Sequence, residues 1–189
     1  GSIYIFYNDG SYPSTATTAD VIITGEAYKP FGRGMTMGDF NADGRTDLAA
    51  TCSTCASDAG QVYVFYNDVS LPATSATADI VITGEAGTNL GLSLTAGDFN
   101  ADGQTDLAGG AYAYGSYDGR AYIFYGGSIV TENASGADIF ITGESSFDWF
   151  GYALTSGDWN ADGRTDLAVN AYYGAGSEAG RVYIFNGGS

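Results

Sequence analysis

The sequence contains no histidine, and its six lysine and arginine residues stand against 22 aspartate and glutamate residues. The absence of histidine removes the usual general base of serine and cysteine hydrolases and the commonest protein ligand of zinc. The formal net charge of −16 argues against nucleic acids and anionic membrane surfaces as partners, because both are bound through clustered basic residues.

Long hydrophobic runs are also absent. No stretch approaches the roughly 20 apolar residues that span a bilayer, so membrane insertion is not expected. The first residues lack the charged and apolar pattern of a signal peptide, and we therefore expect the chain to be a mature or excised piece of protein.

Cysteine is scarce, with only Cys52 and Cys55 in the whole chain. A local surface disulfide and two free thiols both fit this spacing. A thioredoxin-like redox pair is disfavoured because such a pair normally opens a helix, whereas this one follows an expected strand. Zinc is disfavoured because neither histidine nor a second cysteine pair accompanies the motif.

Glycine and apolar residues are abundant. The chain has 29 glycines and is 44% hydrophobic and 14% aromatic, which is enough to bury a core connected by many turns. No segment shows a convincing helical pattern, whereas short apolar runs between turn residues are typical of strands. We therefore expect an all-β fold.

The most informative segment is the nine-residue loop 39–47, which recurs with small changes at 98–106 and 158–166. Oxygen-bearing side chains stand at its positions 1, 3, 5 and 9, and Gly44 allows a sharp bend because it accepts positive φ. The backbone carbonyl at position 7 can face the same point. Hard oxygen ligands at this spacing are typical of Ca²⁺, so we predict three calcium sites per chain. The predicted ligands, with the carbonyl donors at Arg45, Gln104 and Arg164, are Asp39, Asn41, Asp43, Arg45, Asp47, Asp98, Asn100, Asp102, Gln104, Asp106, Asp158, Asn160, Asp162, Arg164 and Asp166.

Two alternatives compete with a functional calcium site. An Asp- and Asn-rich hairpin turn can form without an ion, but such a turn needs no oxygen at position 9 and does not explain three copies. Mg²⁺ is a further alternative, although it prefers fewer protein ligands and more water. A bound ion would serve mainly to hold the hairpins closed, because no loop carries an additional catalytic group.

The loop belongs to a larger repeat with a period near 60 residues. Each copy is preceded by Ile-Thr-Gly-Glu and followed by a Gly-x-Val-Tyr-Val-Phe pattern, which also opens the chain at residues 1–6. Each unit offers four short strand candidates, which in the first complete unit are 32–38, 47–51, 61–66 and 79–83. We expect a single array over 1–189, with N-terminal strands in 1–26 and units at about 27–84, 86–143 and 145–189.

The Phe-Gly at 31–32, the acidic loop, the Asp-Leu-Ala that closes it and the Gly-x-Val-Tyr-Val-Phe run resemble the FG-GAP repeat. This repeat builds the β-propeller of integrin α subunits and of many bacterial relatives. The resemblance implies β-propeller blades of four antiparallel strands, with Ca²⁺ in the hairpin between the first and second strands. The chain departs from the motif where Leu90 replaces phenylalanine and where the Gly-Ala-Pro segment is degenerate.

The strand count predicts about three blades, which is a partial propeller because closed propellers have about four to eight. We expect either a head-to-tail homodimer that completes six blades or excision from a longer array. In a dimer, the segments 2–7 and 181–185 would compete for one third-strand position.

The expected function is a non-enzymatic scaffold for recognition or adhesion of a protein or glycan partner. Its expected location is extracellular, at the cell surface or in the periplasm. A purely structural segment of a larger surface protein is the alternative. An enzyme is disfavoured because the chain has neither a Gly-x-Ser-x-Gly elbow nor a Cys–His pair. In a lectin-like variant, tyrosines after the second strands would stack on sugar rings, with packing between blades as the competing explanation. The main candidates are Tyr112 and Tyr172, with Tyr114, Tyr117 and Tyr173 nearby.

Overall fold

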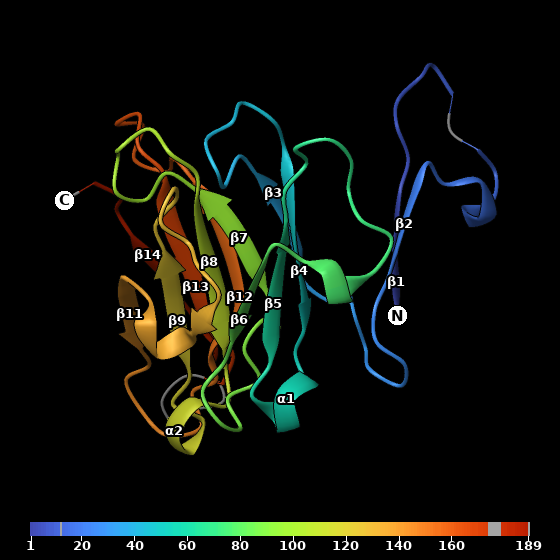
Figure 1. Cartoon of the computed structure of the whole chain (residues 1–189). Helices are drawn as coiled ribbons and strands as arrows, with labels where there is room; N and C mark the ends of the chain where they lie inside the picture. The colour runs from blue at the N-terminus through green and yellow to red at the C-terminus, as the bar shows by residue number, and fades with distance from the viewer. Residues whose placement is uncertain (12, 174–178, 189) are drawn as a thin grey trace.

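The computed structural model describes residues 1–11, 13–173 and 179–188. The described strands form four sheets that follow one another in chain order (Figure 1). The sheets contain β1 (Ser2–Ile5) and β2 (Val21–Thr24); β3 (Met35–Gly38), β4 (Asp47–Cys52), β5 (Gln61–Phe65) and β6 (Ile80–Thr83); β7 (Leu94–Gly97), β8 (Asp106–Ala111), β9 (Arg120–Phe124) and β11 (Ile139–Thr142); and β12 (Phe150–Gly157), β13 (Asp166–Ala171) and β14 (Arg181–Phe185). The expectation of an all-β fold built from antiparallel blades is confirmed.

Each of the two central sheets is a meander in which consecutive strands pair antiparallel. The first strand of the second sheet starts at Met35, later than the predicted residue 32, because Gly32 adopts a φ of 85°. A two-residue strand, β10 (Glu132–Asn133), pairs parallel with the outer edge of β6. The connection that leads into β11 therefore crosses to the preceding sheet, which the repeat pattern did not predict.

Helical structure is limited to single turns. Two four-residue turns, α1 (Cys55–Asp58) and α2 (Tyr114–Tyr117), follow the second strands of their sheets. Neither is a regular helix, because Ala56 and Ser57 in α1 and Gly115 in α2 have positive φ. Three further turns are 3₁₀ helices at Ala16–Thr18, Ser75–Thr77 and Ala134–Gly136. Among the described residues, none of these helices has the length and apolar character needed to cross a membrane.

The core lies between the faces of neighbouring sheets. Val62, Tyr63, Val64 and Phe65 of β5 are all buried because successive side chains meet different neighbouring sheets. This packing explains why the third strands lack the polar alternation of a half-exposed sheet. The sheets are thus stacked as blades of a partial β-propeller.

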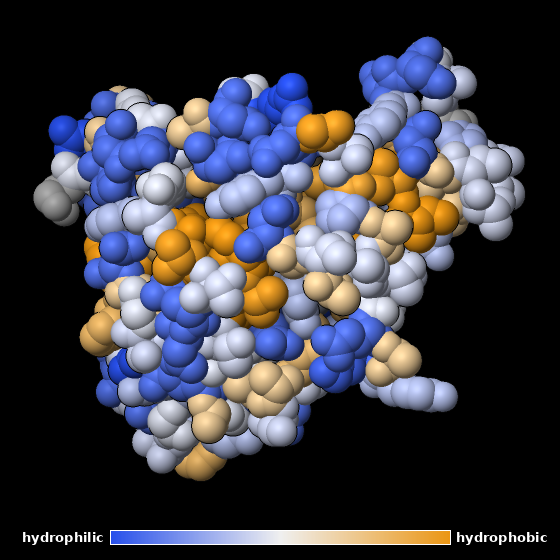
Figure 2. Space-filling view, in the orientation of Figure 1, coloured by the Kyte–Doolittle hydropathy of each residue, from blue (hydrophilic) through white to orange (hydrophobic). Residues whose placement is uncertain are grey.

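The two terminal sheets leave apolar side chains exposed. On β14, Val182 and Ile184 are 68% and 54% exposed, and in the first sheet Tyr4 and Ile22 are 45% and 37% exposed. A cleft of about 500 Å³ separates β1 from β3 and β4. In Figure 2, hydrophobic surface gathers across the middle of the sheets and beside β1 and β2, whereas the upper end is mostly hydrophilic.

Cys52 and Cys55 form a disulfide that joins the end of β4 to α1. Both cysteines are buried within the core between the first two sheets. Of the two alternatives that the spacing left open, the structure contains the local disulfide, in a buried rather than a surface position.

Candidate metal centres

The three acidic hairpins have the same backbone conformation. They connect β3 to β4, β7 to β8 and β12 to β13. The alanine at position 4 has a φ of 59–60° in every copy, and the glycine at position 6 has a φ of 84–87°. The glycine suits this left-handed region, while the alanine is held there by the hydrogen bonds of the loop. The predicted sharp bend is therefore present in all three copies.

Side chains at positions 1, 3 and 5 accept hydrogen bonds from the loop backbone. In the first hairpin, the Asp43 N–H donates to Asp39 Oδ1 at 3.0 Å and to Asn41 Oδ1 at 3.1 Å. The Gly44 N–H donates to Asp39 Oδ2, and the Arg45 N–H donates to Asp43 Oδ1, both at 2.8 Å. The other two hairpins repeat these four bonds at 2.8–3.1 Å. Positions 1 and 3 thus converge on one point in each loop.

The carboxylate at position 9 has a different environment. Asp47, Asp106 and Asp166 are at most 1% exposed. One oxygen of Asp106 accepts from the Phe99 N–H and the other from the Gly126 N–H, both at 2.8 Å. Asp47 and Asp166 make the corresponding pairs of bonds. This side chain therefore ties the hairpin to the end of the third strand, a structural role that the loop pattern alone did not predict.

Burial perturbs these carboxyl groups. Burial raises the pKa of Asp47 and Asp106, and the neighbouring loop aspartates add to the effect, although backbone N–H donors oppose it. At Asp166 the Gly187 N–H has the largest effect, and it lowers the pKa. A nearby divalent cation would favour the charged form at all three positions.

The donor set fits a hard cation, although the side chains do not form a closed cage. Among the described residues, no three side chains of histidine, cysteine, aspartate or glutamate gather closely enough to hold a metal ion. The Asn100 and Asn160 amides instead donate to the position-5 carboxylates at 2.9 and 3.0 Å. Every candidate side chain nevertheless presents oxygen, and the oxygens at positions 1 and 3 already face the same N–H group. All-oxygen donors in a tight turn suit Ca²⁺ better than a transition metal.

The residue at position 2 anchors each hairpin in the core. Phe40 is fully buried and Phe99 is 8% exposed, and both pack between neighbouring sheets. Trp159 holds the same position in the last hairpin but is 46% exposed. The first two hairpins are therefore coupled to the packing between sheets more strongly than the third.

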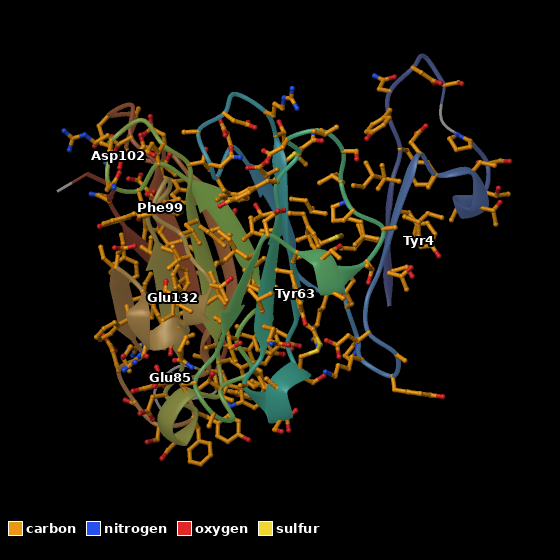
Figure 3. All side chains as sticks on the ribbon, viewed as in Figure 1. Tyr4, Tyr63, Glu85, Phe99, Asp102 and Glu132 are labelled. Atoms are coloured by element: carbon orange, nitrogen blue, oxygen red, sulfur yellow. A yellow bond between two sulfur atoms is a disulfide. The ribbon has the colours of Figure 1, made fainter. Side chains whose placement is uncertain are left out.

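At the opposite end of the sheets, four of the five predicted tyrosines meet in one aromatic cluster. The fifth, Tyr114, lies outside it, with Arg120 Cζ 3.5 Å from its ring centroid. Tyr112 and Tyr172 both contact Trp149 and Tyr152, with ring centroids 5.0–6.1 Å apart. In Figure 1, α2 marks this end, and the label of Asp102 in Figure 3 marks the hairpin end. The sequence prediction missed Trp149 and Tyr152, although the aromatic-rich segment 147–152 has no equivalent in the other repeats.

Repeated glutamates at this end pair with cations. Glu85 Oε1 accepts from the Tyr122 hydroxyl at 2.7 Å and lies 3.2 Å from Arg120 Nη1. Burial, followed by the hydrogen bond to Glu85, raises the pKa of Tyr122 well above its usual range. These contacts join two neighbouring sheets and are architectural.

Comparisons with known proteins agree with this geometry. A family model described as the FG-GAP repeat matches residues 150–185, and one described as an FG-GAP-like repeat matches residues 39–109. The chain is 31% identical over 171 residues to phosphatidylinositol-glycan-specific phospholipase D of Bos taurus, covering 82% of this chain and 20% of that protein. It is 33% identical over 183 residues to integrin alpha-PS2 of Drosophila melanogaster, covering 91% and 12%. It is 34% identical over 163 residues to integrin alpha-V of Gallus gallus, covering 82% and 15%. The chain thus spans a fifth or less of the length of these relatives.

Proposed function

The chain belongs to the FG-GAP repeat family, and from this premise we propose that it is a non-enzymatic recognition scaffold whose blades are stabilised by Ca²⁺. The observation that carries the proposal is the threefold occurrence of one oxygen-lined hairpin with the same backbone turn and the same hydrogen bonds. A chance turn would not be repeated in this detail. The residues that would hold the ions are those at positions 1, 3, 5, 7 and 9 of each hairpin.

A bound ion would supply positive charge where carboxylates crowd together. Two carboxylates about 4–5 Å apart repel by roughly 3–4 kcal/mol at an effective dielectric constant of about 20. Neutralising that repulsion favours the closed hairpin. With a Kd of about 10⁻⁴–10⁻³ M, each site contributes about 0.4–1.4 kcal/mol at about 1 mM calcium.

The proposed location is outside the cytosol. Sites of this affinity class are filled only where calcium is millimolar, and the Cys52–Cys55 disulfide is typical of an oxidising compartment. The similarity to integrin alpha chains agrees with a role in recognition or adhesion. One relative is named a phospholipase D, but the chain covers 20% of it, and nine of the 22 acidic residues of this chain lie in the hairpins.

Equilibrium dialysis against radioactive calcium tests the metal sites. We expect the protein to bind three ions and the Asp98→Ala variant to bind two, because position 1 of one hairpin loses both oxygens. Asp9→Ala removes an exposed carboxylate outside the hairpins and should still bind three. Absence of saturable binding, or equal stoichiometry in Asp98→Ala and the parent protein, would refute the proposal.

The exposed apolar faces of the terminal sheets favour a further blade beside them. We propose that a second copy packs head to tail, or that neighbouring repeats of a longer array cover these faces. Sedimentation equilibrium at micromolar concentration should then detect a dimer, and Ile184→Lys on β14 should shift it to monomer, because a charge on this face opposes burial. Val69→Lys changes a 93% exposed residue of a connecting loop and serves as the control. A monomeric parent protein would contradict the head-to-tail ring.

A further inference from the structure

Among the described residues, seven aromatic rings gather in one partly exposed cluster at the end of the sheets opposite the hairpins. It consists of Tyr112, Tyr117, Phe147, Trp149, Tyr152, Tyr172 and Tyr173. The rings come from the ends of β8 and β13, from α2, from the segment before β12 and from β12 itself. Phe147 is 64% exposed and Tyr172 is 50% exposed. Rings that served only to pack neighbouring sheets would be buried, as Phe65 and Phe124 are.

Part of the cluster does not follow the repeat, although Tyr112 and Tyr172 occupy equivalent positions of two units. Where the last unit has Phe147, Trp149 and Tyr152, the preceding unit has Gly87, Asn89 and Leu92. The architecture of a blade therefore does not require aromatic residues at these positions. Single-copy residues at a surface are better candidates for recognition than residues that every blade repeats.

The backbone supports the same distinction. Phe147 adopts a φ of 66°, where the preceding unit has Gly87 with a φ of 72°. Trp149 adopts a φ of 55°, where the preceding unit has Asn89 with the same value. Glycine and asparagine tolerate this left-handed region, whereas bulky side chains rarely occupy it. Tyr28 of the first unit has a φ of 62° at the position of Phe147, so the turn itself is common to the repeats. What the last unit adds is a second bulky ring, Trp149, in this disfavoured conformation.

The geometry of the rings restricts the ligand. The centroids of contacting rings lie 4.8–6.3 Å apart, so no space remains between these pairs for an ammonium group in an aromatic cage. The exposed ring faces instead offer a stacking surface. Five of the seven residues are tyrosines, which combine an apolar face with a hydroxyl group that donates and accepts hydrogen bonds.

The charged groups around the cluster restrict the class of ligand further. Arg181 pairs with Ala171 across the sheet, next to Tyr172, and its Nη1 lies 3.0 Å from Glu144 Oε2. This exposed ion pair offers both donors and acceptors at the rim. The net charge of −16 opposes an anionic ligand, so a neutral ligand with an apolar face and many hydroxyl groups fits best.

We propose that the aromatic cluster is a binding platform for neutral carbohydrate, with a hexopyranose ring stacked on Tyr172. The apolar face of the sugar covers the rings, and its hydroxyl groups reach the tyrosine hydroxyls and the Arg181–Glu144 pair. The inference rests on the proposed recognition function and names its ligand class. The platform lies at the end of the sheets opposite the hairpins. Calcium would therefore affect sugar binding only by stabilising the folded sheets.

The two tryptophans allow a direct test. Trp149 lies within the platform and Trp159 within the last hairpin, and the chain contains no others. Trp159→Phe restores the residue that the first two hairpins carry and leaves Trp149 as the sole reporter. In calcium-containing buffer, the protein is titrated with neutral hexasaccharides of glucose, mannose, galactose or N-acetylglucosamine. The wavelength of the Trp149 emission should shift and reach saturation with at least one of these sugars. No saturable shift with any of these sugars would overturn the proposal.

Matched substitutions in this single-tryptophan background separate stacking from folding. Tyr172→Ala should weaken sugar binding about tenfold or more without changing the circular dichroism spectrum. Tyr28→Ala should not weaken it, because Tyr28 is fully exposed at the position of the first unit that corresponds to Phe147. Equal weakening in both variants overturns the platform. So does a dimer that Tyr172→Ala dissociates, because the rings would then be an interface between two copies.

Failure of the calcium proposal can be recognised separately. In Trp149→Phe, the remaining Trp159 follows Asp158 at position 1 of its hairpin, and its emission should respond to calcium. If it does not respond while the platform still binds sugar, the metal proposal fails and the carbohydrate proposal stands. The reverse result leaves calcium binding intact and removes the platform.

Discussion

Replacing Asp106 by alanine should lower the free energy of unfolding by about 2–4 kcal/mol in chelator, and by more in calcium, because position 9 is also a proposed ligand of the ion. The side chain is fully buried, and its two oxygens accept from the N–H groups of Phe99 and Gly126 at 2.8 Å. Alanine would leave both donors without an acceptor. Each unsatisfied buried donor costs about 1–3 kcal/mol, partly offset because a desolvated carboxylate is removed.

The matched control is Asp98→Ala in the same hairpin. Asp98 accepts two N–H groups that lie at the surface, where water can replace it. In chelator, urea unfolding should therefore detect a loss below about 1 kcal/mol for Asp98→Ala, whereas in calcium the loss should increase because an ion is no longer bound. Equal effects of the two variants in chelator would show that position 9 acts only through the metal.

The repeat made the general architecture predictable. Strand candidates such as 61–66 and 79–83 correspond to β5 and β6, because apolar runs between turn residues have few other structures available. The hairpins were equally visible, because Gly44 and its equivalents mark a left-handed turn that few residues tolerate. Local chemistry that recurs three times is therefore readable from sequence.

Contacts between distant segments were not readable in this way. The second bond of Asp106 reaches Gly126, and the platform joins segments around Tyr112, Trp149 and Tyr172 that are separated by more than one strand. These contacts depend on the order in which the sheets pack and on how closely neighbouring sheets approach each other. The parallel pairing of β10 with β6 is of the same kind, because its linker leaves its own sheet.

Close approach of sheets also explains the Phe-Gly of the repeat. Gly151 has a φ of 83°. A Cβ added to Gly110 would lie only 1.9 Å from the Gly151 carbonyl oxygen. At the preceding interface, Thr51 holds the position that corresponds to Gly110, and a Cβ on Gly91 would lie 2.7 Å from its Cγ2 atom. At each interface, therefore, the glycine at the Phe-Gly position lies directly against the second strand of the preceding sheet. It meets Gly110 at one interface and Thr51 at the other.

Gly110→Ala should consequently destabilise the protein by about 3 kcal/mol or more, the upper end of what overpacking a core produces. The added methyl group would meet the backbone of Gly151, which cannot rotate away, so the third and fourth sheets must separate. Gly109→Ala, the adjacent position of β8, is the control, because its methyl group would meet only the ends of Leu94 and Leu90 at 3.2 and 3.4 Å. Those side chains can shift, and the loss should stay near 1 kcal/mol. Urea unfolding measures both losses. A loss for Gly109→Ala that equals or exceeds the loss for Gly110→Ala would contradict this account. The distance between the sheets, and with it the alignment of the aromatic platform across them, would then not depend on the backbone contact at Gly151.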